Sequence, residues 1–139
     1  MGVDARAAAG TPIYAPAAST LVMVVQGWFD GQPLMMFKFA QQQAGTEDGD
    51  QMWYVAEQIV PVTETVGTTF QQGQPVAHFA PAGTGIEIGW ASPTCGQYTL
   101  ACQMGDGAAA NPAPGSLTPW AESFKKWTDM PKSWIGISP

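Results

Sequence analysis

Short apolar runs of strand length recur along the first hundred residues, and glycine and proline interrupt them frequently. Residues 19–29 (STLVMVVQGWF) and 33–41 (PLMMFKFAQ) are rich in β-branched, aromatic and other apolar residues without helical spacing. The Asp30-Gly31 pair between them is typical of a tight turn. These segments therefore predict a β-hairpin, preceded by a short extended segment at 11–17.

Further strands are predicted beyond a polar, exposed loop at 41–50. Residues 83–92 alternate most clearly, with Ile86 and Ile88 facing one side and Glu87 the other. Residues 51–60 have the aromatic and β-branched content of a strand, with a short helical turn as the alternative. The other segments expected to contain strands are 61–81, where Gly67 and Gly73 mark turns, and 96–104.

The C-terminal part of the chain has a different pattern. Residues 105–117 form a Gly/Ala/Pro-rich loop, and Thr118 followed by Pro119 predicts the start of a helix that ends before Pro131. One face of this helix carries Trp120, Phe124 and Trp127. We therefore expect an all-β fold with one short C-terminal helix. It comprises a β domain over 1–104, the loop, and a helix and tail over 118–139 that pack on the β domain or on a partner.

Composition narrows the classes of function. Only 12% of the residues are charged and the net charge is −6. Nucleic acids and anionic membranes select clustered lysine and arginine, so neither is an expected partner. No long apolar run predicts a membrane-spanning helix. The chain has a single histidine, His78, whereas most zinc hydrolases and serine-hydrolase triads depend on one or more.

Cys95 and Cys102 are the two cysteines of the chain. Their spacing, with no histidine nearby, makes a poor zinc motif. They bracket a segment that is able to fold back on itself. A disulfide between them and two separate buried thiols are therefore the alternatives.

Three blocks of the chain resemble, in order, the M23 family of zinc peptidases, the lysostaphin- or LytM-type enzymes that cut peptidoglycan cross-bridges. Residues 2–16 (GVDARAAAGTPIYAP) are similar to the opening block, H-x-G-x-D followed by G-T-P-V-Y-A-P. Residues 54–79 (YVAEQIVPVTETVGTTFQQGQPVAHF) are similar to the middle block, Y-x-H-L followed by two glycine turns. Residues 83–90 (GTGIEIGW) stand in the place of the closing block, T-G-x-H-x-H-F-E. The resemblance implies an M23/LytM-like β-sandwich or barrel-sandwich from an actinobacterial or phage protein.

The resemblance also implies a site that has lost most of its ligands. The family's zinc is held by the His and Asp of the opening block and the second His of the closing block, while the other two histidines assist the water. Asp4 matches the ligand aspartate, and the histidine paired with it would lie four residues earlier, outside this chain. Ala56 occupies the position that corresponds to the middle-block histidine. Gly85 and Glu87 stand for the two closing histidines, so no catalytic residue is expected.

Asp4 and Glu87 are weak candidates for holding a hard cation through oxygen. No cofactor is expected, because two carboxylates without histidine make a poor zinc site. The alternative roles are a turn or cap residue for Asp4 and a solvated strand residue for Glu87. His78 matches no ligand position and is expected to be a packed or surface strand residue.

These observations favour a non-catalytic, degenerate relative of the zinc peptidases. Such a module would be a structural component of a phage virion or tail, or a binding component of a bacterial cell-wall-directed protein, in an extracellular, envelope or virion location. The expected partner is a protein or another copy of the chain, with peptidoglycan as a further candidate. The side chains expected at that contact are Trp120, Phe124, Trp127 and Trp134, whose alternative role is to pack the helix on the β domain.

Two other hypotheses belong to different classes. The first is a zinc-dependent peptidoglycan endopeptidase whose missing ligand lies upstream of this chain. The second is a carrier domain of the biotinyl or lipoyl type, which the glycine-turn strands also resemble. A carrier needs an acceptor lysine at a hairpin tip, and the one lysine of the β-region, Lys38, lies inside an apolar segment.

Overall fold

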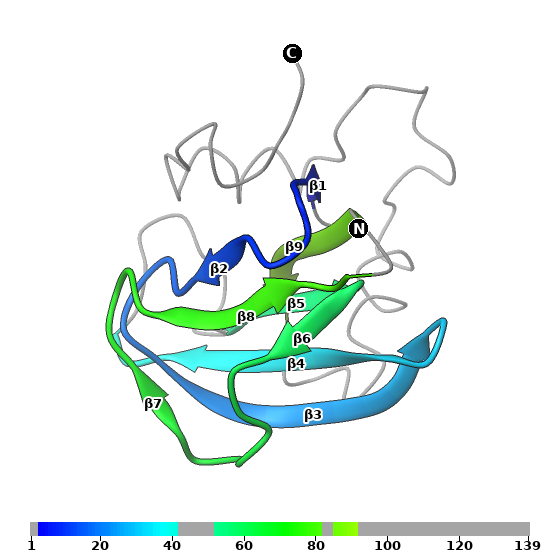
Figure 1. Ribbon diagram of the computed structural model, residues 1–139. Helices are drawn as coiled ribbons and strands as arrows, with labels where there is room; N and C mark the ends of the chain where they lie inside the picture. The colour runs from blue at the N-terminus through cyan, green and yellow to red at the C-terminus, as the bar shows by residue number, and fades with distance from the viewer. Residues whose placement is uncertain (1–2, 42–51, 82–84, 92–139) are drawn as a thin grey trace, which may run out of the picture.

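The structure is a computed structural model that describes residues 3–41, 52–81 and 85–91 (Figure 1). All regular structure in this part of the chain is β-strand, which confirms the all-β expectation. The strands are β1 (Val3–Arg6), β2 (Pro12–Tyr14), β3 (Ser19–Phe29), β4 (Gln32–Phe39), β5 (Met52–Glu57), β6 (Ile59–Pro61), β7 (Thr69–Phe70), β8 (Pro75–Phe79) and β9 (Gly85–Ala91). None of these residues forms a helix able to cross a membrane. The predicted strand at 96–104 and the predicted helix at 118–130 lie outside the described residues.

Two antiparallel sheets make up the fold. The larger has six strands in the order β1-β9-β5-β4-β3-β7, and the smaller has three in the order β2-β8-β6. Figure 1 shows the smaller sheet on one side of the larger one, with β8 and β6 in front of β5 and β4. The first and last described strands, β1 and β9, pair with each other, and β9 also pairs with β5.

The predicted hairpin is present as β3 and β4. Its turn is Asp30-Gly31, and both residues have positive φ, 47° and 77°. Two consecutive left-handed residues suit the twist of a two-residue hairpin, and glycine and aspartate tolerate that conformation best. The turns predicted at Gly67 and Gly73 are confirmed as well, with φ of 95° and 77°, on either side of β7.

The main core lies between the two sheets. Trp53 and Phe37 are fully buried there, with their rings stacked and their centroids 4.2 Å apart, and Phe70 meets Phe37 edge-on at 5.8 Å. The indole Nε1 of Trp53 donates a hydrogen bond of 2.9 Å to the hydroxyl of Ser19, which is itself buried. This bond satisfies the one polar atom of the indole, so the large ring is buried without an unpaired donor.

A second apolar cluster lies on the other face of the large sheet. Its buried members come from β4 and β5: Leu34, Met36, Met52, Tyr54 and Ala56. Met35 and Phe37 alternate with them along β4 and point into the main core. The unbroken apolar run of β4 therefore reflects a strand that is buried on both faces.

The strand β1 was not predicted. Its four residues, VDAR, combine two apolar and two charged side chains, too few to reveal a period. The strand is formed by pairing with β9, a contact between segments at opposite ends of the described chain. Asp4 is therefore a strand residue, and its alternative assignment as a turn or cap residue is wrong.

Candidate functional site

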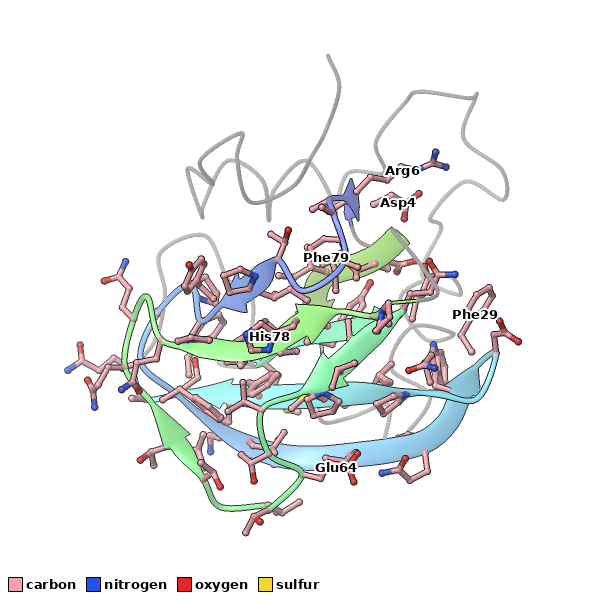
Figure 2. All side chains as sticks on the ribbon, in the orientation of Figure 1. Asp4, Arg6, Phe29, Glu64, His78 and Phe79 are labelled. Carbon is pink, nitrogen blue, oxygen red and sulfur yellow. The ribbon has the colours of Figure 1, made fainter. Side chains whose placement is uncertain are left out.

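Three of the four positions singled out by the family resemblance lie in one row across three strands, and the fourth, Gly85, is two residues before Glu87 on β9. Asp4 of β1 is the register partner of Glu87 of β9, and Glu87 is the register partner of Ala56 of β5. Directly opposed residues of antiparallel strands share a face, with Cβ atoms about 5 Å apart. Segments distant in the sequence thus bring these three positions together, and Figure 2 shows Asp4 and Arg6 at the β1 edge of the row.

Tyr54 connects this row to the second apolar cluster. It lies two residues before Ala56 on β5, which places both side chains on the same face. Its ring is fully buried, and its hydroxyl donates a short hydrogen bond to Oε1 of Glu87. Glu87 therefore faces away from the main core, as its alternative assignment states, but it is a partnered, half-buried carboxylate rather than a solvated one.

Glu57 adds a third carboxyl group to the site. It ends β5 with a φ of 77°, a left-handed conformation that is uncommon for residues other than glycine. Burial, and after it the charges of Glu87 and Asp4, raise the pKa of Glu57 to about 7. The pKa of Asp4 is also raised, by burial and then by Glu87, with the charge of Arg6 acting in the opposite direction.

We expect the stability of the protein to fall between about pH 5 and about pH 8. The folded state holds the Glu57 proton up to about pH 7, whereas the unfolded chain releases it near 4.5. A raised folded-state pKa therefore contributes stability at low pH that is lost as the pH rises through 7. Because Glu57 is partly exposed, solvent screening limits the loss to about 1 kcal/mol. Urea unfolding at several pH values measures this loss of unfolding free energy.

Glu57→Gln should remove most of this pH dependence, leaving a smaller part in the same direction from Asp4. The matched control is Glu64→Gln, since Glu64 accepts an exposed hydrogen bond from Gln26 (2.9 Å) far from the acidic row. That variant should keep the full dependence. A Glu57→Gln protein that loses as much stability as the parent would contradict the assignment.

The donor set of this row does not fit a catalytic zinc. Zinc favours three protein ligands rich in histidine nitrogen or cysteine sulfur. The row offers the carboxylates of Asp4 and Glu87, Ala56 contributes no ligating atom, and Gly85 has no side chain. Within the described ranges, no three His, Cys, Asp or Glu side chains are placed to hold a metal ion together.

The remaining candidates lie elsewhere. His78 is on β8 of the smaller sheet, where Pro12 and Val60 are its register partners, and Figure 2 shows it away from Asp4. Lys38 lies within β4 rather than at a hairpin tip, the place that a carrier domain needs for its acceptor lysine. The cysteines and the aromatic contact residues fall outside the part that the structure describes: Cys95, Cys102, Trp120, Phe124, Trp127 and Trp134.

Sequence reasoning did not identify Tyr54, Glu57 or Gln58 at this site. The side chain of Gln58 accepts a hydrogen bond of 2.9 Å from the backbone N–H of Gly85, so it fastens the start of β9 to the end of β5. Strand periodicity carried a signal for Tyr54, because it is two residues from Ala56 and therefore on the same face. The left-handed conformation of Glu57 has no counterpart in the residue pattern.

Comparison with known proteins supports the fold. No family model and no curated protein matches the chain. The NMR solution structure of lysostaphin is similar to it, with a TM-score of 0.52 and 16% sequence identity over 83% of this chain. The matched region covers 49% of the lysostaphin chain, so this chain spans about half of that protein. At this identity the likeness establishes a lysostaphin-like β fold and nothing about activity.

Proposed function

We propose that this chain is a non-catalytic module with a lysostaphin-like fold that serves as a structural or binding component. The observation that carries the proposal is the row Asp4–Glu87–Ala56. Three neighbouring strands bring these positions together, but a carboxylate stands where the M23 resemblance implies a histidine ligand, and a methyl group stands where it implies a histidine that assists the water. Fold alone does not determine function, so the residue types at this row decide between catalysis and contact.

The surroundings of the row support the same conclusion. Tyr54 already donates to Glu87, and Ala56 is fully buried in an apolar cluster. A hydrolytic zinc needs an open coordination position that holds a water molecule beside the substrate. A buried methyl group next to a carboxylate that accepts a tyrosine hydrogen bond does not provide that position.

The setting we propose follows from the M23 resemblance and the lysostaphin-like fold. The module would belong to a phage virion or tail, or to a protein directed to the bacterial cell wall, and would act in the envelope, outside the cell or on the virion. Its partner would be a protein, a further copy of the chain, or peptidoglycan. Nucleic acid and membrane are not proposed, because the chain carries only five lysine and arginine residues against eleven acidic ones.

Two assays on the full chain test the absence of catalysis. Calorimetric titration with zinc should give no binding tighter than about micromolar, because two carboxylates without histidine hold zinc weakly. Incubation of the zinc-loaded protein with purified peptidoglycan should release no soluble fragments. Tight zinc binding together with fragment release would overturn the proposal in favour of an endopeptidase. Sedimentation of the protein with insoluble peptidoglycan then separates a wall-binding module from a purely structural one.

A further inference from the structure

The outward face of the large sheet is buried although no described element covers it. Four side chains on this face are 0–1% exposed: Leu34, Met36, Tyr54 and Ala56. They belong to the second apolar cluster, on the opposite side of the sheet from β2, β8 and β6. Val22, Met23, Val25 and Trp28 of β3 pack against the cluster, but they belong to the same sheet and flank this face rather than lie over it. Neither described sheet lies over these four residues.

The composition of the rest of the chain identifies what can cover this face. The segment 42–51 (QQAGTEDGDQ) and the segment 82–84 (AGT) contain no apolar side chain larger than alanine. Residues 92–139 contain the large apolar residues Tyr98, Leu100, Leu117, Trp120, Phe124, Trp127, Trp134 and Ile135. They also continue directly from β9, a strand in the middle of the same sheet. Only this segment has the apolar surface that burial of an apolar sheet face requires.

Charge is compatible with the same occupant. The row that borders the apolar cluster is acidic, with Asp4 and Glu87 on the same face and Glu57 beside them. The C-terminal segment has no net charge, because its three lysines are balanced by three acidic residues: Lys125, Lys126 and Lys132 against Asp106, Glu122 and Asp129. It can therefore cover the apolar face without adding net negative charge beside the acidic row.

We propose that the C-terminal segment 92–139 packs on the outward face of the large sheet, with the stripe Trp120, Phe124 and Trp127 over Met36 and Tyr54. The sheet is then the middle layer of three. The row Asp4–Glu87–Ala56 lies beneath the edge of this third layer. Partner binding would therefore use another surface, or would require the segment to leave its place. This packing is a separate proposal from the function proposed above, and it is tested on different residues. Either proposal can therefore fail without the other.

Photo-crosslinking of the full chain tests this packing. Photo-methionine incorporated in place of methionine reports direct neighbours, and Met35 and Met36 form a matched pair, because consecutive residues of β4 face opposite sides of the sheet. Mass spectrometry should find crosslinks from Met36 to residues 118–139. These crosslinks should persist in Met35→Leu and disappear in Met36→Leu, and both changes are conservative enough for the protein to fold.

Refolding a mixture of nitrogen-14 and nitrogen-15 chains identifies the source of the covering segment. Crosslinks confined to peptide pairs of one isotope place the segment on its own sheet and support the proposal. Mixed-isotope pairs would show that a second copy covers the face, which overturns it. Crosslinks from Met36 to 42–51 alone, or none to residues 92–139, would overturn it as well.

Discussion

Trp53→Ala should lower the free energy of unfolding by about 3–5 kcal/mol, the range for removing a large aromatic side chain from a core. Trp53 is fully buried at the centre of the main core, stacked on Phe37. The substitution removes this ring contact, leaves a cavity between the two sheets and removes the hydrogen bond that the buried Ser19 hydroxyl accepts from the indole. Because small domains are stable by only about 5–15 kcal/mol, much of the variant should be unfolded at elevated temperature.

Urea unfolding followed by circular dichroism measures this loss. Trp53→Phe keeps a ring in the core but loses the indole N–H, so its cost should fall clearly below that of alanine. The matched control is Phe29→Ala, because Phe29 lies at the tip of the β3–β4 hairpin with 48% of its surface exposed. Its cost should stay under about 1 kcal/mol. Equal losses for Trp53→Ala and Phe29→Ala would contradict the assigned core.

Ala56→His should also be strongly destabilising, by about 2–4 kcal/mol, although it restores the residue type that the M23 resemblance implies at this position. Ala56 is fully buried beside Tyr54 and Met36. An imidazole there overpacks the cluster, which costs about 1–3 kcal/mol, and buries a polar ring at a further cost. We expect no gain of zinc binding from this variant, because the neighbouring donors remain the carboxylates of Asp4 and Glu87.

Thermal unfolding with and without zinc measures both parts of this expectation. Gly85→Ala is the control on the neighbouring strand, since a Cβ added at Gly85 would meet Oε1 of Gln58 at 3.6 Å, an ordinary contact. It should be close to neutral. An Ala56→His protein that is as stable as the parent, and is further stabilised by zinc, would show that the position still serves as a ligand site.

Much of the fold could be predicted from the residue pattern, because most strands carry their own signal. Ile86 and Ile88 alternate with Glu87 and face the core as expected, and Asp30-Gly31 forms the expected turn. The strand β1 could not be predicted, because it depends on a distant partner rather than on its own four residues. Residues 51–60 were expected to form one strand, and Glu57 with its positive φ divides them into β5 and β6.

Three members of the candidate site could be predicted, but not the chemistry of their surroundings. Asp4, Glu87 and Ala56 were selected by block resemblance, and the strand register brings them together. The burial and hydrogen-bond partners of these residues depend on how distant strands pack together, which the residue pattern of one strand does not reveal. The hydrogen bond from Tyr54 joins β5 to β9, about thirty residues apart in sequence, and the raised pKa of Glu57 arises from burial and then from the charges of Glu87 and Asp4 on two other strands.

The pairing of β1 with β9 joins the first and last described strands, so it limits the order in which the sheet can form. The β3–β4 hairpin joins neighbouring segments, so it can form early and at little entropic cost. Asp4 and Glu87 can meet only after the chain has been made through β9 and the central strands are in place. The acidic row is therefore assembled late, during synthesis as well as during refolding. Until then the edge of β9 that pairs with β1 presents unpaired backbone N–H and C=O groups to other chains.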